Sequence, residues 1–298
     1  MSVEHLSFNT EDGLMLPALV YRSSTQSKVL AIYIHGAGSS SILNNPSLTN
    51  LLADRLISAG VDLLMFNNRG AGYITKLHLT TEKIVSKSQQ LGGMAYERIS
   101  DSVKDINGAI AWARLNGYRS FYLIGHSTGA NKLCYYLSSR EYDKKITRAY
   151  LVSGGDDVGL QINRLDDCKR TRSIVNRAIK KGRGQELVPT KLFPGEHPIS
   201  YNSFKELITE GSDYDMFPFS RYNGSIKGQA IFKNFRTIKI PLTIIYGQND
   251  FGTIVAPGRA METLASIKPN AEYYIIPKAD HNFTGYEKQL VSRILQSL

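Results

Sequence analysis

The sequence predicts an α/β fold, with a mostly parallel sheet of eight strands, helices on both faces, and a helical insertion between the sixth and seventh strands. Short, continuously apolar runs such as 29–34 and 121–124 alternate with amphipathic stretches, as expected when parallel strands are buried on both faces. The alternation then stops for about 85 residues, 155–239, which is more than a simple crossover needs. A single sheet interrupted by one insertion accounts for both observations.

Eight strands are expected in chain order. They are 3–8, 14–21, 29–34, 61–66, 121–124, 146–152, 240–246 and 273–276, and the first two form an antiparallel pair around a Glu-Asp-Gly turn. Helices are expected at 46–59, 94–116 and 131–139, whereas 75–90 has little periodicity and is expected to run over the surface.

The helix expected at 94–116 has two contrasting faces. Ile99, Val103, Ile106, Ile110 and Leu115 would form its buried stripe. Glu97, Asp101 and Asp105 recur every four residues and are expected on its solvated face.

The domain division follows from the same pattern. Residues 1–154 and 240–298 would form the core, and 155–239 would form a cap over the carboxyl ends of the strands. Helical patterns are expected near 160–181 and 201–209 within this insertion.

Composition narrows the class of protein. With 298 residues, 42% of them hydrophobic, the chain can bury a sizeable core. It has neither 18 consecutive apolar residues nor an evident signal peptide, so we expect a cytoplasmic protein without stable membrane insertion. Cys134 and Cys168 cannot form a disulfide framework or a cysteine-rich zinc site, and we expect no metal or cofactor.

The net charge of +10 is concentrated in one segment, because 164–191 holds nine basic residues against three acidic ones. These charges form either a solvated helix face or a surface that attracts an anionic substrate. No nucleic-acid-binding motif accompanies them, so no nucleic-acid partner is expected. The sequence leaves the oligomeric state open.

Residues 125–129 read Gly-His-Ser-Thr-Gly, directly after an apolar strand and before an amphipathic helix. In a sharp strand-to-helix turn of this kind the serine hydroxyl of Ser127 is exposed at the sheet edge as a nucleophile. A side chain at Gly125 or Gly129 would collide where the helix folds back on the strand. The five-residue pattern arises often by chance, so its partners must decide its meaning.

A second glycine-rich loop, 35–38, follows the strand 29–34. Glycines let backbone amides approach a substrate oxygen, and we expect the N–H groups of Ala37 and Thr128 to form an oxyanion hole. Arg69, in the loop after the next strand, either contacts a substrate or braces neighbouring loops.

Asp250 and His281 follow the last two strands. Serine needs a base that works near neutral pH and a carboxylate that orients the base, so Ser127, His281 and Asp250 form the expected catalytic set. Asp156 or Asp157, after the sixth strand, is the rival acid. His126 is expected to orient the turn and to transfer no proton.

Taken together, these motifs resemble the α/β-hydrolase superfamily over nearly the whole chain. Within the insertion, three segments are similar to the cap of a family that includes fungal siderophore esterases, which cleave fusarinine-type esters. They are Gly-Gln-Glu-Leu-Val-Pro (184–189), Pro-Ile-Ser-Tyr (198–201) and Asp-Tyr-Asp-Met-Phe (213–217). The resemblance implies a serine esterase that acts on a small-molecule ester through an acyl-enzyme. A thioesterase, lactonase or peptidase on the same residues, or a non-catalytic ligand-binding protein, remains an alternative.

Overall fold

A computed structural model describes the chain except residues 26, 39, 82–83, 140–141, 194–196, 225–226 and 229–230, and the side chains of 81–88. Its strands are Ser2–Asn9 (β1), Leu14–Arg22 (β2), Val29–Ile34 (β3), Asp62–Phe66 (β4), Thr75–Thr81 (β5), Ile84–Gly92 (β6), Ser120–His126 (β7), Ile146–Val152 (β8), Leu242–Gly247 (β9) and Glu272–Ile276 (β10). Each of the eight expected strands is present, with ends that differ by at most two residues from the prediction.

The helices lie between and beyond these strands. They are Pro46–Ser58 (α1), Ser102–Leu115 (α2), Thr128–Ser138 (α3), Asp157–Ile162 (α4), Cys168–Lys180 (α5), Tyr201–Leu207 (α6), Phe219–Tyr222 (α7), Lys233–Thr237 (α8), Pro257–Ile267 (α9) and Glu287–Gln296 (α10), with a short 3₁₀ helix at Ile99–Asp101 (η1). Local chemistry fixes ends such as those of α1, which starts at an Asn45 side-chain cap followed by Pro46 and stops before Gly60, whose φ is +78°.

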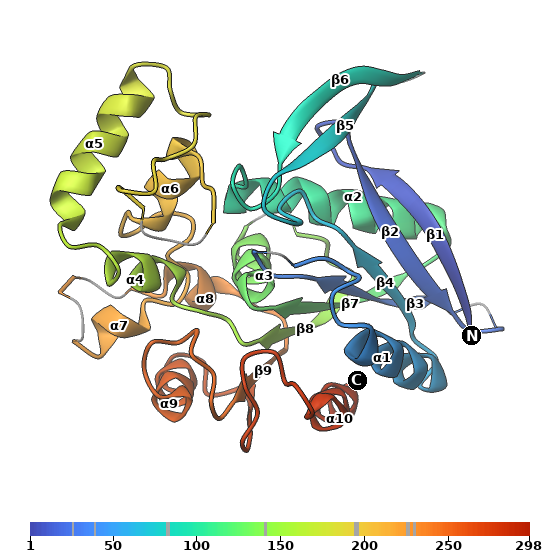
Figure 1. Cartoon of the computed structure of the whole chain (residues 1–298). Coiled ribbons are helices and arrows are strands. Elements are labelled where there is room, and N and C mark those ends of the chain that lie inside the picture. The colour runs from blue at the N-terminus through green and yellow to red at the C-terminus, as the bar shows by residue number, and fades with distance from the viewer. Residues whose placement is uncertain are drawn as a thin grey trace.

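The strands form one sheet in the order β10-β9-β8-β7-β3-β4-β2-β5-β6, with β1 paired to β2 (Figure 1). Neighbours from β10 to β4 are parallel, and the pairs that involve β1, β2, β5 and β6 are antiparallel. The fold class is therefore confirmed. The strand number is a correction, because the sheet has ten strands rather than eight.

The two additional strands are the hairpin β5–β6, in the segment that was expected to run over the surface. Only the middle of β5 pairs with the main sheet, through Leu79 opposite Leu14 and His78 opposite Met15. The hairpin then extends away from the helical layers at the top of Figure 1. A hairpin held mainly by its own backbone ladder needs few buried side chains, so it leaves a weak hydrophobic pattern.

Side chains of opposite parity divide the core into two layers. Leu30, Ile32 and Ile34 of β3 face the layer that holds α2, α3 and α9. Ala31 and Tyr33 face the layer that holds α1 and α10. Both faces of the central strands are buried, which explains why these strands are continuously apolar in the sequence.

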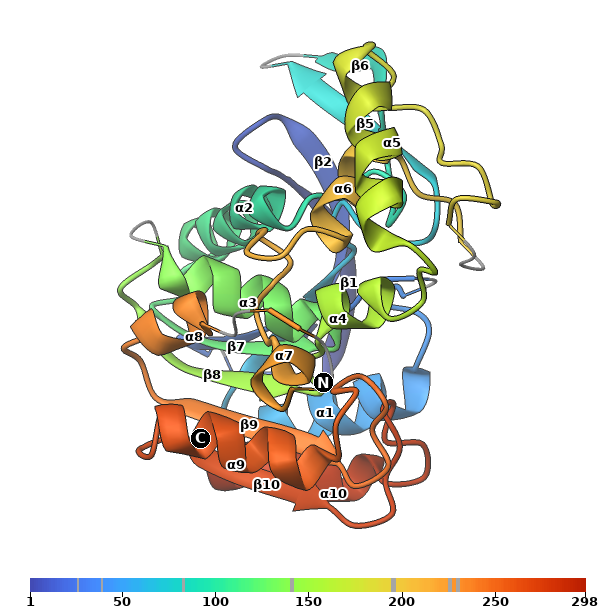
Figure 2. The ribbon, with the colours of Figure 1, turned by 90° about the vertical axis from the view of Figure 1, so that its left-hand side faces the viewer.

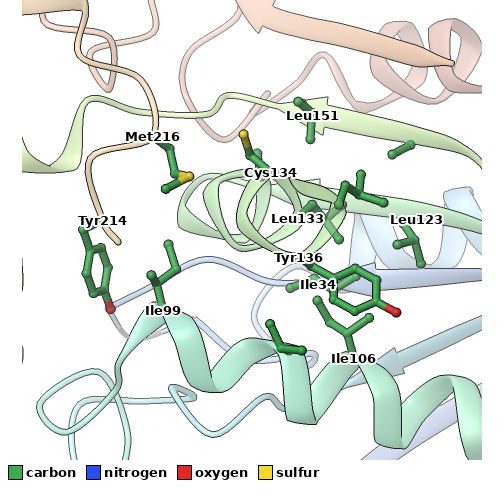
Figure 3. Close-up of a cluster of buried hydrophobic side chains, with 14 of the residues drawn as sticks. Ile34, Ile99, Ile106, Leu123, Leu133, Cys134, Tyr136, Leu151, Tyr214 and Met216 are labelled. Atoms are coloured by element: carbon green, nitrogen blue, oxygen red, sulfur yellow. The ribbon is translucent and has the colours of Figure 1, made fainter. Parts of the chain in front are cut away.

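The insertion packs on the core at α3. Tyr214 and Met216 belong to the same buried cluster as Ile99 and Cys134, and Figure 3 shows Met216 beside α3, which carries Cys134, and Tyr214 beside Ile99 at the start of α2. The two views agree that α5 lies on the outer side of the insertion (Figures 1 and 2). The expected helical stretch at 160–181 is divided into α4 and α5.

The helix predicted at 94–116 begins later than expected, at η1 and α2. Ile99, Val103, Ile106 and Ile110 are buried as predicted. Leu115 is wrongly placed on the buried stripe, since it is 89% exposed as the last residue of α2. Among the described residues, no helix has the length and apolar character needed to span a bilayer.

Candidate active site

Ser127 occupies a sharp turn between β7 and α3. Its φ of 58° and ψ of −133° are unusual for a residue with a side chain, and its N–H donates to the Val152 carbonyl over 2.9 Å. The glycines on either side are required sterically. A Cβ at Gly125 would lie 2.4 Å from the Gly129 oxygen, and one at Gly129 would lie 2.2 Å from the Ile34 oxygen. The strained turn therefore depends on both glycines, as the motif predicts.

His281 and Asp250 extend from Ser127 in a hydrogen-bonded row. His281 Nε2 lies 2.9 Å from Ser127 Oγ, and His281 Nδ1 lies 2.8 Å from Asp250 Oδ1. The two loops that carry them are packed together, because Asn249 N–H donates to the Ala279 carbonyl and a Cβ at Gly247 would lie 2.4 Å from the Asp280 oxygen. The structure thus brings together three side chains that are up to 154 residues apart in the chain.

The environment of Asp250 favours its carboxylate form. Burial would raise the pKa of Asp250, but the hydrogen bond from His281 and the charge of His281 outweigh burial and lower it. The Gly252 N–H also donates to Asp250 Oδ1 over 2.8 Å. A buried carboxylate that stays ionised can hold the imidazole in one tautomer and stabilise its charged form.

The two rival carboxylates have other partners. Asp156 caps α4 through the Gly159 N–H and accepts from the Ser220 hydroxyl, whereas Asp157 accepts from Asn131 Nδ2 over 2.9 Å. Burial and the neighbouring charge of Asp156 raise the pKa of Asp157 to about 7. Neither carboxylate is hydrogen-bonded to the His281 ring, so the geometry favours Asp250 as the acid.

The two candidate oxyanion donors flank Ser127. Thr128 is the first residue of α3, so its N–H has no acceptor within the helix. Ala37 follows Gly36, and a Cβ at Gly36 would lie 2.8 Å from the Ser127 Cβ. This close approach brings the glycine-rich loop after β3 beside the nucleophile.

His126 lies inside the turn and braces the loop of His281. Its Nε2 lies 2.8 Å from the His281 carbonyl oxygen. Burial and the neighbouring His281 lower the pKa of His126 to about 4, so the ring is neutral at pH 7. A neutral ring bound to a carbonyl orients the turn, as the sequence interpretation expects.

A cavity of about 380 Å³ opens behind the glycine-rich loop, and its lining is mostly polar. Gly36, Ser40, Asn45, His126 and Asn282 are among the residues that border it. The hollows along α5 are bordered by basic residues such as Arg164, Arg170 and Lys191. Ser127, His281 and Asp250 line neither these hollows nor the 380 Å³ cavity. In the described part of the chain, no group of three or more His, Cys, Asp or Glu side chains could hold a metal ion.

The acidic row of 97, 101 and 105 is the clearest correction near the site. Glu97 and Asp105 are buried rather than solvated. Asp105 Oδ1 accepts from Arg69 Nη2 over 2.7 Å, and Glu97 Oε1 lies 2.6 Å from Lys132 Nζ. The prediction was wrong because the cations come from the loop after β4 and from α3, which only the tertiary fold brings to this face.

Of the two roles that the sequence left open for Arg69, substrate contact and bracing of neighbouring loops, the contacts of Arg69 support bracing. Besides Asp105, it donates to both carboxylate oxygens of Asp12 over 3.0 Å. With 4% of its surface exposed, Arg69 has little room to reach a substrate.

Four groups in or beside the glycine-rich loop were not recognised from the sequence as buried partners: His35, Asn68, Glu97 and Lys132. One signal was present, since Lys132 is the one charged residue of α3. A lysine there predicts a buried partner, but the sequence does not say which carboxylate it is.

His35 yields a pH prediction. Burial and the charge of Lys132 lower its pKa to about 3, although its bond to the Gly36 carbonyl opposes the shift. The unfolded chain binds a proton near pH 6.5 that folded His35 binds only near pH 3, so the free energy of unfolding should fall as pH drops through this window. The slope from this one group is about 1.4 kcal/mol per pH unit.

Denaturant unfolding of the parent and of His35→Phe between pH 7 and 4 measures this contribution. The difference in unfolding free energy between the two proteins should shrink as pH falls, because the variant lacks the titrating ring. Parallel pH curves would contradict the prediction.

The comparisons with known proteins agree with this architecture. The family model of the alpha/beta hydrolase fold matches residues 31–286. The search of curated proteins finds no match. Among solved structures, an esterase of Pyrococcus furiosus, PF2001, is 19% identical with a TM-score of 0.58, covering 99% of this chain and 89% of that one.

Two further structures have a similar fold at 14% identity. Siderophore hydrolase EstB from Aspergillus fumigatus has a TM-score of 0.64, covering 99% of this chain and 97% of its own. Est1E from Butyrivibrio proteoclasticus, solved with ferulic acid bound, has a TM-score of 0.62 over 96% of this chain and 94% of its own. The family match spans most of the chain, and the sheet order and Ser127 turn agree with it, so this chain belongs to the alpha/beta hydrolase fold family.

Proposed function

We propose that this chain is a serine hydrolase that cleaves carboxylic esters of small molecules through an acyl-enzyme intermediate. The hydrogen-bonded row of Ser127, His281 and Asp250 at the carboxyl edge of the sheet carries the proposal. A serine in a strained turn, a base within 2.9 Å and a buried carboxylate behind that base are the parts needed for nucleophilic catalysis.

In the proposed reaction, Ser127 Oγ attacks the ester carbonyl carbon while its proton moves to His281 Nε2. The N–H groups of Ala37 and Thr128 bind the negative oxygen of the tetrahedral intermediate. His281 then gives the proton to the departing alcohol oxygen, which leaves an acyl group on Ser127. Water repeats the sequence with His281 as base, which releases the acid and restores the serine. No cofactor takes part in these steps.

Segment 155–239 is proposed as the cap of this site. Phe217 supports this role, because a Cβ at Gly154 would lie 2.8 Å from its ring, beside the exit of β8. If this segment shapes the pocket, Phe217→Ala, which removes a buried ring beside the exit of β8, should alter kcat/KM for bulky esters more than for p-nitrophenyl acetate.

The proposed class of ester rests on the similarity of this chain to other proteins. EstB is a siderophore hydrolase and Est1E was solved with ferulic acid, so siderophore and hydroxycinnamate esters are the first natural candidates. The three insertion segments that resemble siderophore esterases point to the same class. Thioesters, lactones and peptides are the competing substrates for the same residues.

The test is a pre-steady-state assay of the purified protein. With p-nitrophenyl acetate, we expect a burst of about one p-nitrophenol per chain followed by slower turnover, because deacylation is a separate step. A fluorophosphonate probe should label Ser127 and abolish the burst. A protein that binds these esters without turnover and resists the probe would instead be a non-catalytic ligand-binding member of the family.

A further inference from the structure

A buried network of polar side chains links α3 to the glycine-rich loop after β3. It consists of His35, Asn68, Glu97 and Lys132, each at most 3% exposed. Lys132 lies on α3, five residues after the proposed nucleophile, whereas His35 opens the loop that carries Ala37. The polar network therefore connects the two elements that would supply the oxyanion donors.

The ion pair at one end of this polar network is costly to bury. Lys132 Nζ lies 2.6 Å from Glu97 Oε1, and the two side chains are 0% and 1% exposed. The backbone of Gly70 covers the carboxylate so closely that a Cβ there would lie 2.2 Å from it. Because an apolar pair of similar volume is often as stable as a buried ion pair, fold stability alone does not account for these charges.

A hydrogen bond from Lys132 fixes the position of the Asn68 side chain. Asn68 Oδ1 accepts from Lys132 Nζ over 3.2 Å and from the Gly70 N–H over 3.0 Å. Two donors on this atom identify it as the oxygen, so Nδ2 points the other way and donates to the His35 carbonyl over 3.1 Å. Asn68 is thus held at both ends of its side-chain amide.

Asn68 also fixes the tautomer of His35. The backbone N–H of Asn68 donates to His35 Nε2 over 3.1 Å, so Nε2 must be the acceptor and the ring proton sits on Nδ1. His35 Nδ1 then donates to the Gly36 carbonyl over 2.8 Å. The imidazole is held between two backbone groups in one neutral form.

The Gly36 carbonyl and the Ala37 N–H belong to the same peptide group. No cis peptide occurs in the described chain, and a trans peptide is planar with its C=O and N–H pointing in opposite directions. A donor that holds the Gly36 carbonyl therefore sets the direction of the Ala37 N–H. Gly36 itself could rotate freely, since it has no side chain to restrict it.

We propose that the buried Glu97–Lys132 pair is a positioning device for the oxyanion hole: it holds Asn68, Asn68 fixes His35, and His35 aims the Ala37 N–H. This inference rests on the proposed ester hydrolysis. Lys132, Glu97 and Asn68 touch no reacting atom in this scheme and act only through the peptide that they orient.

The double variant Glu97→Met/Lys132→Met separates positioning from stability. Lys132→Met alone leaves a buried carboxylate without its cation and should lower the Tm. The double variant removes both charges and should restore the Tm, but Asn68 still lacks its donor from α3. We expect kcat for p-nitrophenyl acetate to fall about 10- to 100-fold with KM within twofold, somewhat less than the loss of a whole oxyanion donor.

A second variant and an inhibitor test the positioning role without relying on the restored Tm of the double variant. Asn68→Ala leaves the ion pair in place and cuts its link to His35, so it should reduce kcat by a similar factor. A trifluoromethyl ketone, whose adduct carries an oxyanion, should bind both variants more weakly by the same factor as kcat. The matched control is Tyr118→Phe, which removes a buried 2.8 Å bond to Asp62 at the opposite end of β4 and should lower the Tm alone.

The outcomes separate cleanly. Parent-like kcat and inhibitor affinity in both the double variant and Asn68→Ala would overturn the positioning role while leaving ester hydrolysis intact. An equal loss of kcat in Tyr118→Phe would also overturn it, because the effect would then follow from general destabilisation. A parent protein without esterase activity would overturn the proposed function, and this inference with it.

Discussion

Ser127→Ala is expected to lower kcat for ester hydrolysis by on the order of 10⁶-fold, the largest effect of any single substitution. The hydroxyl is the atom that forms the acyl bond, and the remaining oxyanion donors and binding contacts accelerate the reaction only about 10³- to 10⁴-fold over water. The assay is steady-state hydrolysis of p-nitrophenyl acetate by both proteins, together with fluorophosphonate labelling of the parent. Activity within tenfold of the parent would contradict the assignment of Ser127.

A matched control separates the lost hydroxyl from any change in folding. Ser127 has a φ of 58°, a conformation that costs a residue with a side chain about 1–3 kcal/mol and costs glycine little. Ser127→Gly should therefore be as inactive as Ser127→Ala but more stable to denaturant. Two variants with equal inactivity and different stability would show that chemistry, rather than unfolding, explains the loss.

Asp250→Asn is expected to lower kcat by up to about 10⁴-fold, the second largest effect. An amide at this position can present its NH₂ group to His281 Nδ1, which favours the wrong imidazole tautomer and leaves Nε2 protonated when it should accept from Ser127. The measurement is kcat for the same ester across pH 6 to 9. Fluorophosphonate labelling should slow in parallel, because it depends on the same activation of Ser127.

The rival carboxylates provide the control for this second prediction. Asp156→Asn removes a charge that caps α4, so it should lower stability, and Asp157→Asn should change the contact to Asn131. Both variants should retain kcat within about tenfold of the parent, since neither carboxylate bonds to the His281 ring. If either proves more damaging than Asp250→Asn, the acid of the site follows β8 instead of β9.

Buried apolar runs and glycine turns are short-range signals, and they were sufficient for most of the fold. The strand 29–34 was predicted with the bounds that the structure has, because both of its faces are buried and every residue is apolar or aromatic. The strand 146–152 also has its predicted bounds, although Thr147 and Arg148 interrupt its apolar run. The β5–β6 hairpin was not predicted, since it pairs mainly with itself, and Leu77 is the one buried side chain among those described in it. Leu115 was misplaced because the helix ends there, which a hydrophobic stripe does not reveal.

The sequence by itself determined the fold class and the candidates Ser127, Asp250 and His281, because each of them follows a recognisable strand and chain order limits where parallel strands end. Only the tertiary structure decided that Asp250, rather than Asp156 or Asp157, meets His281, and that Glu97 and Lys132 form a buried pair beside the glycine-rich loop. The physical reason is the range of the interactions. Turns and strand burial are encoded by neighbouring residues, whereas a salt bridge or hydrogen bond forms between atoms that are distant in the chain, and its partner is fixed only when the elements have packed.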